Sequence, residues 1–194
     1  MQTLAQDTPA AAPAAREARA DEPLQLAAYH PSWPARFRVE SEVLRVALAP
    51  LSPVLEHVGS TAVPGLAAMP VVDIALGVAQ PAAVDAHADR LANFGYRLQA
   101  VADGASADRR TLTRVVHGVR THEVHVLTAF GDAWHRMLLF RDMLRLDRDL
   151  ALAYESLKRE LAQQTRGRPH LYAAGKADFI GSVIGRAAFA AGAR

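Results

Sequence analysis

The 194-residue sequence contains no cysteine, only two lysines and no long apolar run. The lack of cysteine excludes disulfides and thiolate metal sites and suits a reducing compartment, so any bound metal must be held by His, Asp or Glu. The stretch PVVDIALGVA at 70–79 is interrupted by an Asp and is shorter than the roughly 18 residues that span a bilayer. The N-terminus lacks the basic start and continuous apolar stretch of a secretory signal. We therefore expect a cytoplasmic protein with no membrane partner.

The charge balance is nearly even, with 22 basic and 20 acidic residues and a net charge of +2. This small excess is too diffuse for a dedicated nucleic-acid surface, so we rank nucleic-acid binding last among the functions considered. Residues 1–25 are rich in Ala and Pro and are predicted to be a disordered tail, because they cannot bury enough apolar surface to offset the entropy of ordering. Residues 26–194 have the length and composition of a single globular domain.

The spacing of apolar residues predicts an α/β (α+β) fold, a mixed sheet backed by helices with a helical C-terminal third. Adjacent β-prone runs should pair locally, and the amphipathic helices need a sheet face to cover. Helices are predicted over 30–50, 81–95, 134–145, 150–164 and 176–190, and strands over 54–58, 70–78, 96–101, 111–116 and 122–128, with a hairpin turn at 117–120 and a break at 166–175.

The turn between the first two predicted strands is the strongest candidate for a functional site. Gly59 permits a close backbone approach, Ser60 and Thr61 offer hydroxyls, and the nearby amides could form an anion nest that holds a phosphate. Asp73 lies in the following apolar strand, where a carboxylate must be paired, hydrogen-bonded or bound to a metal. The alternative is an ordinary turn in which Asp73 caps backbone amides.

A second polar group follows from the motif HEVHV at 122–126. Strand alternation places Glu123 and His125 on one face, where they could join Asp73, and His122 on the other face. Such a mixed set suits zinc, manganese or iron better than magnesium, which prefers oxygen ligands. The candidate cofactor is a divalent metal: magnesium, manganese or zinc. The alternative is that these histidines are surface or hydrogen-bonded sheet residues.

His57 and Glu56 point to opposite strand faces, so only one of them can lie on the side of Asp73. Which one does so is not decided by the sequence. His57 is a candidate phosphate contact, and the alternative is a histidine that fills the sheet edge.

Three further cations are candidates for phosphate binding. Lys158 and Lys176 each follow a tyrosine by four residues, Tyr154 and Tyr172, and the guanidinium of Arg141 matches phosphate geometry. The alternative is that Arg141 pairs with a nearby acid and that the lysines are solvated.

The chain resembles a known family in six ordered segments. They are YHPSWPARF, HVGSTAVPGLAAMPVVDI, HEVHV, FRDMLR, YESLK and YAAGKADFI, which lie between residues 29 and 180 and look like the GrpB family. The spacing from Gly59-Ser60 to Asp73 also resembles the nucleotidyltransferase superfamily, whose turn contacts nucleotide phosphates and whose strand acids bind magnesium. The resemblance implies a nucleotidyltransferase-like fold. Related segments also occur fused to bacterial dephospho-CoA kinases, where an accessory folding role has been suggested.

Two positions depart from these patterns. Ala75 stands where active nucleotidyltransferases usually carry a second acid, and Met69 stands where the GrpB-type segment commonly has a lysine. The resemblance itself implies a protein that binds a nucleotide or another phosphate-bearing small molecule, and the two departures bear on catalysis. Metal-dependent nucleotidyl transfer would rest on Asp73 and Ser60. The alternative is a noncatalytic ligand-binding or protein-folding accessory domain, and the sequence names no protein partner.

Overall fold

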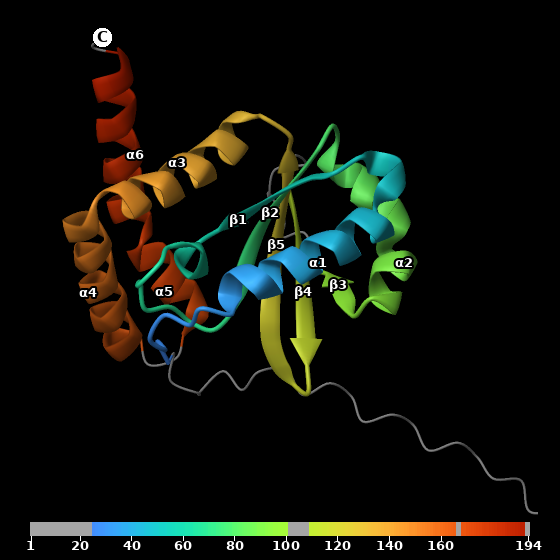
Figure 1. Cartoon of the computed structure of the whole chain (residues 1–194), viewed down its shortest axis with the longest axis horizontal. Helices are drawn as coiled ribbons and strands as arrows, with labels where there is room; N and C mark the ends of the chain where they lie inside the picture. Colours follow the sequence, from blue (N-terminus) through green and yellow to red (C-terminus); the bar gives the residue numbers. More distant parts are fainter. Residues whose placement is uncertain (1–24, 101–108, 166–167, 193–194) are drawn as a thin grey trace, which may run out of the picture.

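The structure, a computed structural model, describes residues 25–100, 109–165 and 168–192, and a mixed five-stranded sheet forms the centre of this part (Figure 1). The strands are β1 (Val54–Val58), β2 (Val72–Val78), β3 (Tyr96–Leu98), β4 (Arg109–Val116) and β5 (Val119–Thr128). Their spatial order is β1-β2-β5-β4-β3, in which β2 and β5 run parallel and the other neighbours run antiparallel. The predicted α/β (α+β) mixed sheet is confirmed.

The helices follow the predicted order, with two local corrections. They are α1 (Trp33–Ala47), α2 (Ala88–Asn93), α3 (Asp132–Leu146), α4 (Arg148–Gln164), α5 (Pro169–Gly175) and α6 (Ala177–Gly192), with short 3₁₀ turns η1 (Ala49–Leu51), η2 (Ser60–Ala62) and η3 (Pro81–His87). The helix predicted over 81–95 is a 3₁₀ turn in its first half. The break predicted over 166–175 contains α5, because Pro169 stands at the first helical position, where its missing N–H has no cost.

The two faces of the sheet are covered by different helices. The largest apolar cluster lies under α1 and α2 and includes Trp33, Leu44, Ile74 and Val124. On the other face α3 packs through Trp134, and α3, α4 and α6 form a further cluster beyond it. In Figure 1, α1 crosses the front of the sheet and the C-terminal helices gather at the left. The helical C-terminal third therefore forms a wall opposite one sheet face.

The β4–β5 hairpin turns more tightly than predicted. Val116 pairs with Val119, so the turn consists of His117 and Gly118, both with positive φ (51° and 79°), as a tight two-residue turn requires. Of the four residues predicted for the turn, the last two belong to β5 instead. This turn sets where β5 begins, and β5 is the strand that pairs with β2.

Two sequence expectations fall outside the described ranges. Residues 1–24 of the predicted tail lie outside them, as does Val101 of the strand predicted over 96–101. Among the helices that the structure does describe, none combines the length and apolarity needed to cross a bilayer.

Candidate functional site

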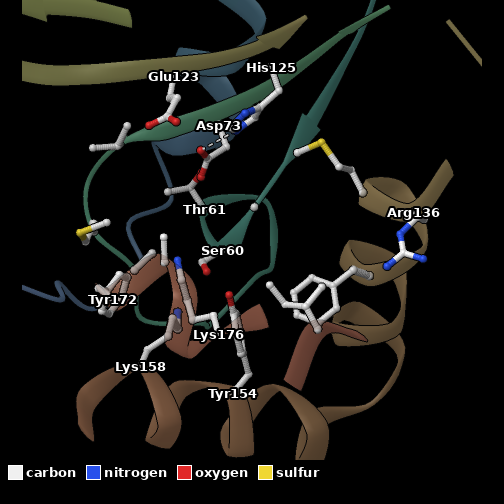
Figure 2. A pocket seen from close by; sticks show the side chains of 18 of the residues that line it. Ser60, Thr61, Asp73, Glu123, His125, Arg136, Tyr154, Lys158, Tyr172 and Lys176 are labelled. Carbon is white, nitrogen blue, oxygen red and sulfur yellow. Dashed lines mark hydrogen bonds and ion pairs between the residues drawn. The ribbon is translucent and has the colours of Figure 1, made fainter. Parts of the chain in front are cut away.

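A pocket of about 960 Å³ lies between the sheet face that carries Asp73 and the C-terminal helices (Figure 2). The β1–β2 turn and strands β2, β4 and β5 supply one wall, and helices α3 to α6, together with Lys176, supply the other. Several predicted site residues meet here: Gly59, Ser60, Thr61, Asp73, Glu123, His125, Lys158 and Lys176.

Gly59 and Asp73 are held together by the antiparallel β1–β2 pair. Val58 is the register partner of Asp73, so the chain leaves β1 directly beside the carboxylate. Gly59 has φ +68°, and a Cβ built on it would lie 2.3 Å from Oδ2 of Asp73. Only glycine permits both this backbone conformation and this approach. The predicted Gly-Ser-Thr turn therefore lies against Asp73.

The turn itself is a short 3₁₀ segment. The amides of Ala62 and Val63 donate to the carbonyls of Gly59 and Ser60 (both 3.2 Å). Two of the amides proposed for an anion nest are thus used within the turn. What the turn offers the pocket is the half-buried Ser60 side chain, which points into the cavity in Figure 2.

The parallel β2–β5 pair assembles the polar face, as strand alternation predicts. Asp73 is the register partner of Glu123, and Ala75 is that of His125. Nε2 of His125 lies 3.3 Å from Oδ1 of Asp73. Glu123 forms an ion pair with Arg120 at 3.0 Å. Asp73, Glu123 and His125 therefore share a face, and each already has a protein partner.

These three side chains share a face but are not gathered into a compact group of metal donors. Within the described ranges no three His, Asp or Glu side chains lie close enough together to hold a metal ion. The position of the expected second acid, Ala75, is fully buried in the apolar cluster of Val58, Leu127 and Trp134 and offers no oxygen. The predicted group of Asp73, Glu123 and His125 is therefore incomplete as a metal site.

Lys158 and Lys176 both line the pocket, each against the ring of its tyrosine. Nζ of Lys158 lies 5.1 Å from the ring centroid of Tyr154, and the ammonium donates to the carbonyl of Ala67. Burial lowers the pKa of Lys158 to about 8. Lys158 is thus buried at the base of the pocket, not solvated.

Lys176 follows the last residue of α5 and lies nearer the carboxylates. Its Nζ is 4.3 Å from the ring centroid of Tyr172, and Figure 2 shows its amine directed toward Asp73. Burial lowers the pKa of Lys176, while the charges of Asp73 and Glu123 oppose that shift. Tyr172 and Lys176 meet across a helix end, not within one helix.

Two predicted ligand-binding residues lie elsewhere. His57 is on the sheet face opposite Asp73, where its ring stacks on Phe37 (centroids 4.9 Å apart) and its Nε2 lies 3.0 Å from Oγ1 of Thr61. Burial lowers the pKa of His57 to about 4. Glu56 is the member of the pair that shares the side of Asp73. The structure therefore does not bring His57 into the pocket.

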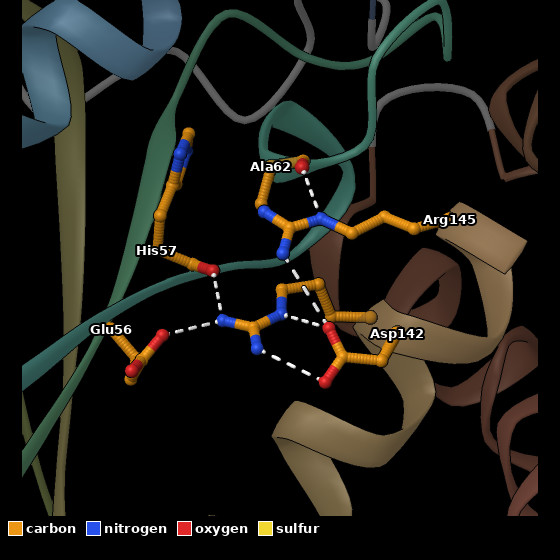
Figure 3. A network of polar contacts seen from close by, with 6 residues as sticks. Glu56, His57, Ala62, Asp142 and Arg145 are labelled. Atoms are coloured by element: carbon orange, nitrogen blue, oxygen red, sulfur yellow. Dashed lines mark hydrogen bonds and ion pairs between the residues drawn. The ribbon is translucent and has the colours of Figure 1, made fainter.

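Arg141 is a structural cross-link between α3 and β1. Figure 3 shows this network, with its partners Glu56, His57 and Asp142 labelled. Its guanidinium donates to Oε2 of Glu56 (2.7 Å), to the carbonyl of His57 (3.0 Å) and to both carboxylate oxygens of Asp142 (2.7 and 3.1 Å). Only 8% of the residue is exposed, and it does not line the pocket. Arg141 therefore pairs with nearby acids, as the alternative interpretation of the sequence held, and does not contribute to the pocket.

The pocket also contains residues that the sequence did not single out. Arg109, Arg120 and Arg136 add cationic groups, and Met137, Phe140, Ile180 and Ile184 form an apolar side between α3 and α6. Arg109 is the register partner of Leu127 and so shares the face of His125. The strand was predicted to begin at residue 111. Had it been predicted to begin at 109, strand alternation would have placed Arg109 on the pocket face. Phe140 and Ile180 lie at apolar positions of predicted helices, and this pattern is typical of core residues, so it did not indicate a pocket.

The arrangement of strands and helices places the chain in a known structural class. The Cid1 poly(U) polymerase superposes with a TM-score of 0.50 at 16% identity, over 70% of this chain and 44% of that chain. At this identity the likeness concerns the fold alone. The protein has a nucleotidyltransferase-like fold.

A narrower assignment follows from the sequence relatives. The family model described as GrpB protein matches residues 23–186, and the chain belongs to the GrpB family. The crystal structure of GrpB from Enterococcus faecalis is 31% identical, with a TM-score of 0.72 over 84% of this chain and 96% of that chain. A dephospho-CoA kinase of Mycolicibacterium paratuberculosis is 32% identical over 85% of this chain, which spans 46% of the kinase.

Proposed function

We propose that this GrpB-family protein binds a phosphate-bearing small molecule, a nucleotide, in the pocket between β2, β5 and the C-terminal helices. The observation that supports the proposal is an excess of positive charge in a concave site. Among the described pocket residues, five cationic side chains face three carboxylates: Arg109, Arg120, Arg136, Lys158 and Lys176 against Asp73, Glu123 and Asp132. Arg and Lys in a recessed site are the usual partners of phosphate oxygens.

The shape of the pocket favours an elongated ligand with two chemically different ends. The charged end is formed by the strands and the two lysines. The apolar end, with Met137, Phe140, Ile180 and Ile184, suits a base or an aliphatic arm. A volume of about 960 Å³ accommodates a nucleotide, or a nucleotide with an attached arm as in dephospho-CoA. We therefore infer that the phosphates lie among the cations, which include Lys176 and Arg136, and that the apolar part lies against Met137, Phe140, Ile180 and Ile184.

Nucleotidyl transfer would require more than binding. If a divalent metal were bound, Asp73, Glu123 and His125 are the donors that would hold it, and it would neutralise charge on the transferring phosphoryl group. The proposal stops at binding because Ala75 supplies no second acid on β2. Asp73 and Ser60 remain the residues to test for chemistry.

A second candidate function rests on the kinase relative. Because this chain is similar to less than half of a dephospho-CoA kinase, a noncatalytic accessory domain that supports the folding of such a partner is the alternative. Its signature would be a partner kinase that refolds in higher yield with this protein present, whether or not the pocket is intact.

Calorimetric titration with ATP, dephospho-CoA and pyrophosphate tests the proposal. Arg136→Glu reverses a charge at the pocket, and Arg186→Glu makes the same change on the exposed surface of α6. We expect binding to wild type, a loss of about tenfold or more (about 1.4 kcal/mol) in Arg136→Glu, and no change in Arg186→Glu. No binding by wild type, or equal losses in both variants, would contradict the proposed site. Pyrophosphate release by wild type and by Asp73→Asn then separates a transferase from a binder.

A further inference from the structure

Two of the three pocket carboxylates, Asp73 and Glu123, lie where the metal-binding acids of a nucleotidyltransferase-like fold are expected, yet other side chains of the protein already contact them. Asp73 and Glu123 are register partners on adjacent parallel strands. His125 contacts Asp73, and Arg120 pairs with Glu123. Ala75, which follows Asp73 on the same face of β2 and is the register partner of His125, has no ligand atom in its side chain. A divalent ion entering here would meet occupied acids and resident positive charge.

Lys176 reaches the same place from the opposite wall. It is half-buried at the junction of α5 and α6, and the ring of Tyr172, 4.3 Å from Nζ, supports the stem and the charge. Its ammonium is attracted by both Asp73 and Glu123, and no other residue of α5 or α6 lining the pocket carries a permanent positive charge in the described part of the chain. The amine is directed toward Asp73 in Figure 2.

We propose that Lys176 is the resident cation of this site, directing its ammonium across the pocket toward Asp73 and Glu123, where its charge disfavours a divalent metal and is presented to a phosphate of the ligand. The inference rests on the proposed function for the identity of the ligand. The claim that a lysine takes the place of a metal applies to the protein without a ligand, and it can be tested without one. Phosphate binding through this site is then independent of magnesium or manganese.

Manganese binding to the free protein tests the core of the proposal without a nucleotide. Electron paramagnetic resonance counts free Mn²⁺ during titration of wild type, Lys176→Met, the double variant Lys176→Met/Asp73→Asn and the surface control Arg186→Met. We expect negligible binding to wild type and to the control. Removing the ammonium should lower the positive charge that faces the two carboxylates, so Lys176→Met should bind Mn²⁺ at least about tenfold more tightly, and the double variant should lose that gain.

Lys176→Gln serves as a second variant in case the methionine perturbs the α5–α6 junction, and circular dichroism checks the fold of each. Mn²⁺ binding by wild type at least as tight as by the variants would overturn the proposal. So would the absence of a gain in both folded variants.

Nucleotide binding forms the second arm. ATP titrated in EDTA should bind wild type as tightly as in Mg²⁺, within about twofold, and about tenfold more weakly in Lys176→Met. Binding that requires Mg²⁺ would refute the inference while leaving the proposed function standing. If ATP does not bind under either condition, the proposed function fails, and the Mn²⁺ titration still decides the role of Lys176.

Discussion

The carboxylate of Asp73 fills the space that any side chain at position 59 would need. A Cβ on Gly59 would come within 2.3 Å of Oδ2 and 2.8 Å of Cβ and Cγ of Asp73. The turn and the strand carboxylate are therefore one unit, because neither can move toward the other without collision.

Replacing Gly59 by alanine should disrupt this unit. Gly59→Ala combines an unfavourable positive φ with the collision at Asp73, so we expect the free energy of unfolding to fall by about 2 to 4 kcal/mol in urea denaturation. Gly65→Ala is the matched control, because Gly65 also has a positive φ (+80°) but no atom within 4 Å of the added Cβ. It should lose only about 1 kcal/mol. Equal losses would mean that contact with Asp73 contributes nothing.

Arg141 should matter for stability and not for ligand binding. Arg141→Met removes the bonds to Glu56, Asp142 and the carbonyl of His57, and we expect the free energy of unfolding to fall by about 2 to 3 kcal/mol. The ATP affinity should stay within about twofold of wild type. Arg136→Glu should give the opposite pattern, with weakened binding and little change in stability. If Arg141→Met folds but loses much of its ATP affinity, the prediction is wrong and Arg141 takes part in ligand binding.

Lys158 should make the protein more stable in mild alkali. Its pKa is about 8 in the folded protein and ordinarily near 10.4, so the unfolded chain binds more protons between these values. The free energy of unfolding should therefore rise between pH 8 and about 9.5 by up to about 2 kcal/mol, and this gain is lost below pH 8. Urea denaturation at pH 7.5, 8.5 and 9.5 measures it. Lys158→Met should show a smaller rise, and an unchanged rise would contradict the assignment.

The buried histidines should make the protein sensitive to acid. Burial lowers the pKa of His57 and His122 to about 4, so the unfolded chain binds more protons between pH 6.5 and 4. The free energy of unfolding should fall as the pH drops through this range, by up to about 3 kcal/mol for each histidine. Within the described part, Nε2 of His122 has no hydrogen-bond partner, so His122→Leu should remove about half of this fall. The exposed His135→Leu should leave it unchanged, and equal curves for both variants would exclude His122 as the cause.

Local patterns predicted the features that depend on neighbours in the sequence. The Gly59–Asp73 unit follows from a turn between two short strands, and the shared face of Glu123 and His125 follows from strand alternation. The helical C-terminal third follows from apolar periodicity. In each case the decisive interaction lies within one element or between consecutive elements.

Features that depend on tertiary placement were not predictable in this way. The side taken by His57 depends on which sheet face packs against α1, and alternation alone leaves that open. The partner of Arg141 lies 85 residues away in β1. Arg120 and Arg136 become pocket residues only because the hairpin and α3 meet at the same cavity, and nothing in their local sequence distinguishes them from other arginines.

The position of β5 has a consequence for synthesis of the chain. β5 is the middle strand of the sheet but the last of the five in sequence. A nascent chain that ends before Val119 can form only the separate pairs β1–β2 and β3–β4, each with an open edge where β5 belongs. His125 and Asp73, 52 residues apart, meet only when β5 closes this gap. The pocket therefore cannot be transplanted as a contiguous peptide, and C-terminal truncations that reach β5 should expose strand edges prone to aggregation.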